Sequence, residues 1–394
     1  AIAAAKSGDT VVLTMDTNED VTIDKDITLD LNGKTLTNTN AGKATISVTD
    51  GTVTVKNGTV TGGTSYYNIE VKKDSGANLT LENVTATAGN TGSSMIDNWG
   101  TLTIESGTYE DGLNVVKSEE GSTLTINGGT FTGTYATDGY TGVILVYGDT
   151  TITGGEFIQS LTTTGRWAHP QVVATGVVEG YTAITRVTGG TFTNKKSGEG
   201  IFRGIGKATS DNFEVSGGTF NRSISEGYCA DGFIPTKNAD GTYGVKEGQY
   251  LAQIVKANGK LGNKYETLAE AVAKASAKQT VKLLVDVTED VTINKNITLD
   301  LGGKTLTNTG TGKATVTIAA GADATVKNGS IVGGKSYYTI QNNGTATFEN
   351  VTATAGNVGS SMLDNFGTLT IKSGKYTGGM NTVKNEPDAK LTIT

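Results

Sequence analysis

The feature that most constrains this chain is a long internal repeat. Residues 10–39 recur at 280–309 with 22 identities in 30 positions, at a constant offset of 270. A second block, 83–109, matches 350–376 at 22 of 27 positions. The chain therefore holds one long module and the beginning of a second copy. Because Ala1 aligns with Ala271, inside a helical pattern, and Thr394 aligns with Asn127, we expect the sequence to be a segment of a longer tandem array.

A shorter pattern repeats inside the first module, as in TLTIESGTY, TLTINGGTF and TTITGGEF. Successive copies begin 22 to 35 residues apart. Periods of this length predict a solenoid, in which no unit buries its apolar face alone and each must stack on its neighbours. The anchor positions of the repeat are Gly33, Gly58, Val84, Gly107, Gly129, Gly155, Gly190 and Gly218.

The repeat also predicts the type of solenoid. Leu102 and Ile104, like Leu124 and Ile126, alternate with threonine, which places apolar side chains on one face of a strand. Pairs such as Asn57-Gly58 follow and suit a sharp corner, because Asn and Gly tolerate a left-handed backbone. With 55 glycines and only three prolines, we predict an all-β fold: a right-handed parallel β-helix of about nine rungs, followed by a truncated copy.

A solenoid needs covered ends, because an open terminal turn exposes core and unpaired strand edges. Residues 265–277 carry apolar side chains at helical spacing and predict a cap helix before the second module, with residues 1–8 as a remnant of the same helix. Residues 227–248 predict a closing hairpin. We therefore expect a first module at 1–248, with rungs over 10–225, and a second, truncated module at 249–394.

The cap helix TLAEAVAKA, the run VTIDKDITLDLNGKTLT, the stacked rungs and the closing DGTYGV together resemble a known family. They look like the parallel β-helix modules of large surface proteins from Gram-positive, often gut-dwelling, bacteria, which are similar in fold to the pectate-lyase superfamily. The resemblance implies a secreted, adhesin-like protein of the cell wall or cell surface. Lyases, hydrolases and passive stalks share this fold, so the resemblance alone does not choose among them.

Composition narrows the classes of partner. A net charge of -7 and a pI near 5.0 disfavour nucleic acid, since phosphate binding needs a basic face. No apolar run approaches the roughly 20 residues that cross a bilayer, so we expect no membrane-spanning segment in this sequence. Cys229 is the only cysteine and cannot form an intramolecular disulfide. The acidic run at 16–26 is interpreted as a solvated edge, and we expect no metal and no cofactor.

Ligand-binding residues are expected where the repeat is interrupted. The interval from Gly155 to Gly190 is about ten residues longer than its neighbours and contains the only histidine of the chain. Trp167 there could stack on a sugar ring while Arg and His side chains bind hydroxyls or a carboxylate; alternatively, Trp167 and Pro170 pack the inserted loop onto the wall. The predicted ligand-binding residues are Arg166, Trp167, His169, Arg186, Arg203 and Arg222.

Two aromatic motifs recur in both modules. Tyr66-Tyr67 returns as Tyr337-Tyr338, and adjacent strand positions suggest that one ring is core and the other surface. Trp99 in Asp97-Asn98-Trp99 is replaced by Phe366 in the second module, which indicates packing. We favour structural roles for both motifs.

The sequence shows no convergent set of catalytic carboxylates. Glu82 and Glu105 occupy equivalent places, but the next rungs have Asn127 and Thr153, a ladder better explained as polar surface. We therefore expect no catalytic residues. The favoured function is a non-catalytic adhesin-like module that binds a glycan or a host surface protein. The alternatives are a β-helical polysaccharide lyase or hydrolase, or its remnant, and a structural spacer of a cell-wall protein.

Overall fold

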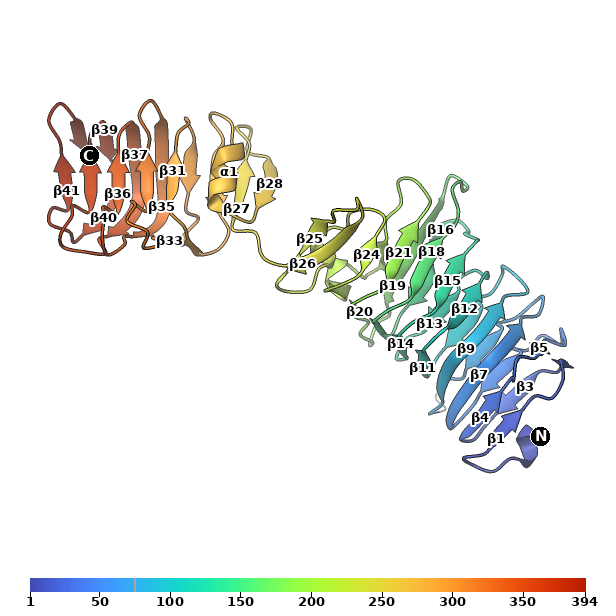
Figure 1. Cartoon of the computed structure of the whole chain (residues 1–394). Helices are drawn as coiled ribbons and strands as arrows, with labels where there is room; N and C mark the ends of the chain where they lie inside the picture. The colour runs from blue at the N-terminus through green and yellow to red at the C-terminus, as the bar shows by residue number, and fades with distance from the viewer. Residues whose placement is uncertain (74–75) are drawn as a thin grey trace. The chain divides into compact units, whose positions relative to one another are not determined.

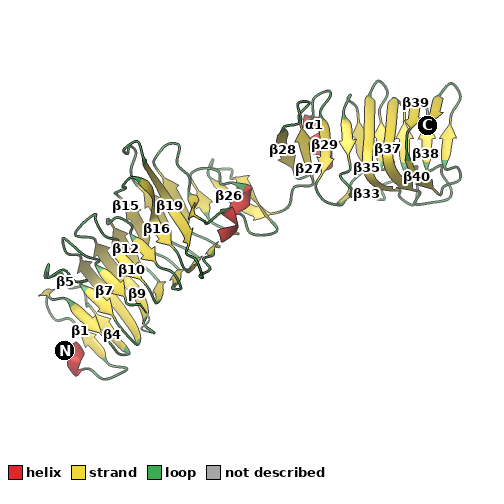
Figure 2. Cartoon of the chain, turned by 180° about the vertical axis from the view of Figure 1, so that it is seen from behind, coloured by secondary structure: helices red, strands yellow, loops and turns green. Residues whose placement is uncertain are grey.

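A computed structural model describes residues 1–73 and 76–394 of the chain, and it is almost entirely β-sheet (Figure 2). Stacked parallel strands form a solenoid of about 15 turns, which confirms the predicted parallel β-helix. The chain divides into two compact units, Ala1–Glu247 (unit 1) and Gly248–Thr394 (unit 2). Each unit has its own hydrophobic core.

Each turn of unit 1 contributes strands to three faces, and each strand pairs in parallel with its equivalent in the next turn (Figure 1). The long strands β7 (Thr52–Thr61) and β9 (Asn78–Thr87) bend through a corner and belong to both of the first two faces. The first face consists of β1 (Thr10–Val12), β4 (Ile27–Asp30), β7 (Thr52–Thr61), β9 (Asn78–Thr87), β11 (Thr101–Ile104), β14 (Thr123–Ile126), β17 (Asp149–Ile152), β20 (Thr185–Val187) and β23 (Phe213–Val215). The second face consists of β2 (Thr17–Asn18), β5 (Thr35–Thr37), β7, β9, β12 (Gly107–Glu110), β15 (Thr130–Gly133), β18 (Glu156–Gln159), β21 (Thr191–Asn194) and β24 (Thr219–Phe220). The third face consists of β3 (Val21–Ile23), β6 (Ile46–Val48), β8 (Ile69–Val71), β10 (Ile96–Asn98), β13 (Val116–Ser118), β16 (Gly139–Val146), β19 (Ala168–Val177) and β22 (Phe202–Gly206).

The two ends of unit 1 differ from its middle. At the N-terminal end, Ile2–Ala4 form a single 3-10 turn, η1. Two further 3-10 turns, η2 (Ser210–Asn212) and η3 (Glu226–Tyr228), lie near the other end. There β25 (Phe233–Lys237) and β26 (Tyr243–Glu247) form an antiparallel hairpin, and β26 also pairs with β24.

Unit 2 repeats the arrangement with fewer turns. Its first face consists of β29 (Thr280–Leu283), β32 (Thr298–Asp300), β35 (Asp323–Val332), β37 (Thr345–Thr354), β39 (Thr368–Ile371) and β42 (Lys390–Ile393). Its second face consists of β30 (Val287–Thr288), β33 (Thr305–Thr307), β35, β37 and β40 (Gly374–Thr377). Its third face consists of β31 (Val291–Ile293), β34 (Val316–Ile318), β36 (Ile340–Asn342), β38 (Leu363–Asn365) and β41 (Val383–Asn385).

The start of unit 2 is covered by a short helix and a hairpin. Helix α1 (Leu268–Lys274) confirms the predicted cap helix, with the Thr267 side chain accepting the Glu270 N–H at 3.1 Å as an N-cap. Its buried residues are Leu268, Ala271 and Val272. The preceding strands β27 (Ala252–Val255) and β28 (Leu261–Tyr265) form an antiparallel pair that the sequence analysis did not predict. Strand β27 also pairs with β29 in antiparallel orientation.

The core of unit 1 consists of side chains stacked in register from turn to turn. Leu102, Ile104, Leu124 and Ile126 are fully buried, as the alternation predicts. On the second face, the aromatic ring at the same position of successive turns forms a continuous stack. The ring centroids of Tyr109 and Phe131, Phe131 and Phe157, and Phe157 and Phe192 are 5.0, 4.9 and 4.8 Å apart. Each ring thus completes the packing of the next.

The corners between the first two faces use the left-handed backbone that the sequence predicts. Asn57 has a φ of 57° and Gly129 a φ of 103°. A Cβ at Gly129 would also lie 3.1 Å from the Gly107 carbonyl oxygen of the preceding turn. Glycine is therefore required there by both the backbone angle and the spacing of the turns.

A second corner, at the end of the third face, is held by a ladder of asparagines, of which Asn342 and Asn365 are buried. In unit 2 the Asn342 amide donates to Asn365 Oδ1 at 2.7 Å, and the Asn365 amide donates to Asn385 Oδ1 at 2.6 Å. Each residue is the last of its third-face strand. The ladder satisfies polar groups that the turn would otherwise leave unpaired in the interior.

Candidate functional site

The predicted ligand-binding residues do not meet at one place. Arg166 and Trp167 lie just before β19, where the Trp167 side chain is 62% exposed and the Arg166 guanidinium sits 4.9 Å from the ring centroid. Arg186 points outward from the first face and pairs with Glu214 through Nε at 2.9 Å. Arg166 and Trp167 therefore lie on a loop, whereas Arg186 lies on the first face of the solenoid.

His169 and Arg222 instead contact the turn between β21 and β22. His169 Nδ1 lies 2.8 Å from Glu199 Oε1, and the Gln171 amide donates to the other oxygen of Glu199 at 2.7 Å. Arg222 donates to the backbone carbonyls of Asn194, Lys196 and Glu199. Arg222 is therefore committed to holding this turn. Arg203, on β22, lines an adjacent pocket together with Glu199 and Tyr228.

The outer surface of the third face carries a ladder of polar residues that the sequence analysis missed. The strand register places Thr22, Ser47, Glu70, Asp97 and Lys117 side by side on successive turns. Their strand neighbours, such as Ile46 and Val48, point into the core, so these five point outward. Glu70 and Asp97 are nevertheless buried, at 5% and 0% exposure.

Asp97 is the most perturbed group of this ladder. Its Oδ2 accepts the Trp99 indole N–H at 2.8 Å. The pKa of Asp97 is raised to about 6, chiefly by burial and then by the Glu119 carboxylate, against the lowering effect of the Trp99 hydrogen bond. Glu119 itself pairs with Lys117. The carboxylates of Glu119 and Glu70 thus both raise the pKa of Asp97, so these acids lie near one another, unlike the scattered acids that the sequence suggests.

A groove opens at the N-terminal end of this ladder and is present in both units. The equivalent pockets have cavity volumes of about 550 Å³ in unit 1 and about 490 Å³ in unit 2. We call them the recurring groove. In unit 1 its lining includes Glu19, Asp20, Thr22, Thr39, Lys43, Ser47, Tyr66, Glu70 and Lys72. In unit 2 its lining includes Glu289, Asp290, Thr292, Thr309, Thr311, Lys313, Thr317, Tyr337 and Gln341.

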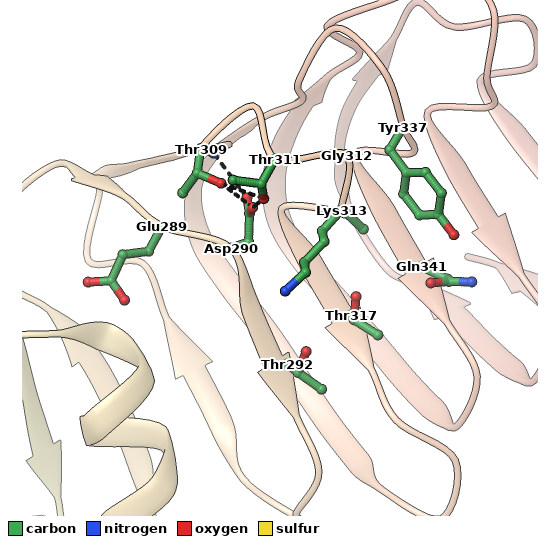
Figure 3. Close-up of a pocket in the computed structure, with 11 residues that line it drawn as sticks. Glu289, Asp290, Thr292, Thr309, Thr311, Gly312, Lys313, Thr317, Tyr337 and Gln341 are labelled. Atoms are coloured by element: carbon green, nitrogen blue, oxygen red, sulfur yellow. Dashed lines mark hydrogen bonds between the residues drawn. The ribbon is translucent and has the colours of Figure 1, made fainter.

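Figure 3 shows how the groove of unit 2 is assembled. The loop after β33 supplies Lys313, whose side chain reaches down between Asp290 and Thr317. Thr292 and Thr317 come from neighbouring third-face strands, and the Tyr337 ring stands at the far side beside Gln341. Three successive turns of the chain therefore contribute to one concave polar surface.

The two carboxylates of this groove are held by the protein itself. Asp290 Oδ1 accepts the Thr309 N–H at 3.0 Å, and Oδ2 accepts the hydroxyls of Thr309 and, at 2.9 Å, Thr311. Glu289 accepts the backbone N–H groups of Leu268 and Ala269 at the start of α1, at 2.9 and 3.1 Å. Both side chains thus fix the loop and the helix. Glu289 and Asp290 belong to the repeat of the acidic run, which the sequence analysis interpreted as a solvated edge.

The paired tyrosines connect the groove to the buried aspartate. Tyr66 and Tyr67 are both half-buried, with ring centroids 4.7 Å apart at 60°, and Tyr337 and Tyr338 repeat this geometry. Neither ring of the first pair belongs to the core, so the interpretation of one as a core residue was wrong. The pKa of Tyr67 is raised to about 12 by burial and, secondly, by the charge of Asp97.

Among the described residues, no group of three or more His, Cys, Asp or Glu side chains has the arrangement of a metal site. None of the helices in that part of the chain is long and apolar enough to cross a lipid bilayer. The recurring groove was detectable in sequence only through the reappearance of Lys43, Thr39 and Tyr66 as Lys313, Thr309 and Tyr337. Thr39 and Lys43 lie on one turn and Tyr66 lies on the next, and the repeat alone does not bring them together.

Comparison of the chain with protein-family models, with curated proteins and with solved structures found no match.

Proposed function

We propose that this chain is a non-catalytic, carbohydrate-binding segment of an adhesin-like surface protein, in which the recurring groove of each unit binds one sugar. The observation that carries the proposal is the reconstruction of the same groove at the same place in both units. Lysine, threonine and tyrosine return at equivalent positions, and they project from loops and outward strand positions. Packing of the solenoid core does not require these side chains.

The chemistry of the lining suits a sugar. In the described part of unit 2, the hydroxyls of Thr292, Thr317 and Tyr337 and the amide of Gln341 have no hydrogen-bond partner in the protein, and all four line the groove. Hydroxyl and amide groups can exchange hydrogen bonds with sugar hydroxyls, while the tyrosine ring offers an apolar surface to the sugar ring. The cavity volumes fall within the range of roughly 300–1,000 Å³ typical of small-ligand sites.

Two observations favour binding over hydrolysis. A glycosidase needs two carboxyl groups that reach the substrate from opposite sides of the scissile bond. Asp97, the carboxyl group with the raised pKa, is fully buried and cannot contact a substrate in this conformation. In unit 2 the carboxylates of Glu289 and Asp290 are occupied by backbone and hydroxyl donors.

Trp167 is a second candidate for ligand contact, because it is 62% exposed and its large ring can pack against a ligand. Its partner Arg166 already lies near one face of the ring, and the unit 2 sequence that would align with this loop is not part of the chain. A host surface protein is the alternative ligand at this loop.

A glycan array probed with the full chain tests the proposal. We expect the double variant Tyr66→Ala/Tyr337→Ala to lose about tenfold or more in affinity for the sugars bound, because each groove loses its aromatic wall. The matched control Trp167→Ala, an aromatic truncation outside the groove, should bind as the original chain does. Circular dichroism would establish that each variant is folded.

Two results would contradict the proposal. One is binding that Trp167→Ala abolishes and the tyrosine variant retains, which would place the ligand on the inserted loop. The other is the absence of any bound glycan on the array, which would favour the spacer. Release of unsaturated or reducing ends from polysaccharides would instead identify an enzyme.

A further inference from the structure

The charged side chains that line the recurring groove differ in whether the protein itself supplies them with hydrogen-bond or ion-pair partners. In unit 2 the groove is lined by two acidic residues and one basic residue. Asp290 accepts three hydrogen bonds and Glu289 accepts two, so both carboxylates are committed to the protein. The Lys313 ammonium, by contrast, forms no hydrogen bond or ion pair with any described residue. It is the one charge of this lining that is available to a ligand.

Unit 1 shares this asymmetry in part, because the carboxylate of Glu19, the counterpart of Glu289, has no partner among the described residues. Asp20 accepts the N–H and the hydroxyl of Thr39, and Glu70 is paired with Lys72 at 2.6 Å. Lys43, the equivalent of Lys313, again has no partner among the residues that the structure describes. An unpaired lysine therefore occurs at the same place of the groove in both units, in a chain whose net charge is -7.

We infer that the sugar bound by the recurring groove is acidic, and that its carboxylate or sulfate sits on Lys43 in unit 1 and on Lys313 in unit 2. This inference rests on the proposed carbohydrate binding. Figure 3 shows the Lys313 ammonium reaching toward Thr292 and Thr317, so an anionic group there would receive one charged donor and neighbouring hydroxyl donors. Charge-assisted hydrogen bonds of this kind are about twice as strong as neutral ones.

The two grooves are not equivalent toward an anion. Glu70 pairs with Ser47 in the strand register of unit 1, and Gln341 pairs with Thr317, the counterpart of Ser47, in unit 2. Unit 1 therefore has a glutamate where unit 2 has a glutamine. Glu70 places a second negative charge beside the anionic group of the ligand, although its pairing with Lys72 reduces that repulsion. Gln341 is neutral and can donate a hydrogen bond. Unit 2 is therefore the tighter site for an acidic sugar.

Titration of the full chain with three ligands that share one core tests this inference. The ligands are lactose, sialyllactose, which adds a carboxylate, and sulfated lactose. We expect at least one of the two anionic ligands to bind about tenfold more tightly than lactose, in a salt-sensitive manner. Lys313→Met should remove about tenfold of that preference and Lys43→Met less, and in both variants the affinity for the anionic ligand should fall by a larger factor than the affinity for lactose. The sialylated and sulfated arms identify which anionic group is recognised.

Lys335→Met is the matched control, because Lys335 is an exposed lysine of unit 2 that does not line the groove. Equal affinity for all three ligands, or an anion preference that survives Lys43→Met/Lys313→Met, would overturn the inference. If either result is found while Tyr66→Ala/Tyr337→Ala still abolishes sugar binding, the groove binds sugars without recognising an anion through the lysine, and the proposed function stands. If the tyrosine variant also binds normally, the proposed function fails as well.

Discussion

At the scale of single residues, the chain separates groups that hold the solenoid from groups that remain available. Asp290 is conspicuous in sequence as part of a charged surface and Arg222 as a candidate ligand-binding residue. Both carboxylate oxygens of Asp290 and both terminal nitrogens of Arg222 are nevertheless hydrogen-bonded within the protein. Lys313 and Tyr337 attract less notice in sequence and remain available. Hydrogen-bond occupancy, which sequence does not reveal, decides which polar residue can bind a ligand.

Asp97 gives the clearest residue-scale prediction. Its folded-state pKa of about 6 lies above the value of about 3.9 expected for an unfolded chain, so the unfolded chain loses this proton first as pH rises. The free energy of unfolding should therefore fall as the pH rises from about 4 to about 6, and it should stay lower above that range. Asp97→Asn stays neutral and keeps an acceptor for Trp99, so it should be more stable at pH 7 by about 3 kcal/mol.

Urea unfolding of the original chain and of Asp97→Asn at pH 4 and pH 7 measures this difference. The two proteins should have similar stabilities at pH 4 and diverge by pH 7. Asp138→Asn, at an exposed position, should track the original chain at both pH values. An Asp97→Asn variant that is less stable at pH 7 would show that the charged carboxylate, not the neutral acid, is the form that the fold holds.

At the scale of strands and turns, the sequence predicts the first two faces well and the third face poorly. The first two faces are recognisable because Leu102 and Ile104 alternate with threonine and because a glycine such as Gly129 marks most corners. The third face lacks such a consensus, since its short strands combine core residues such as Ile96 with outward polar residues such as Asp97. The groove lies at this third face, so the sequence analysis placed the candidate site elsewhere.

The aromatic stack of the second face should be the most sensitive element to truncation. Phe157 is fully buried between Phe131 and Phe192, so Phe157→Ala leaves a cavity with rings on both sides. We expect a loss of about 3–5 kcal/mol in the free energy of unfolding of unit 1. Phe366→Ala, the same substitution at a position 47% exposed, should cost well below 1 kcal/mol. Chemical denaturation measures both, and equal costs would show that the rings do not stabilise the stack.

At the scale of the whole molecule, the tandem repeat duplicates the recurring groove as well as the fold. The offset between equivalent groove residues is 270 for Lys43 and Lys313 but 271 for Tyr66 and Tyr337. The one-residue difference falls between the second and third turns, and the groove is nevertheless lined by the same residue types in both units. Weak sites repeated along one chain can give a high avidity for a surface that displays many copies of one sugar.

The most direct measurement of this account is the number of sugars bound per chain. Calorimetric titration with the tightest-binding sugar should give two sites on the full chain, one site on Tyr66→Ala, one on Tyr337→Ala and none on the double variant. A single site that Trp167→Ala removes, or two sites that survive the double variant, would contradict the claim that the recurring groove is the binding surface of each unit.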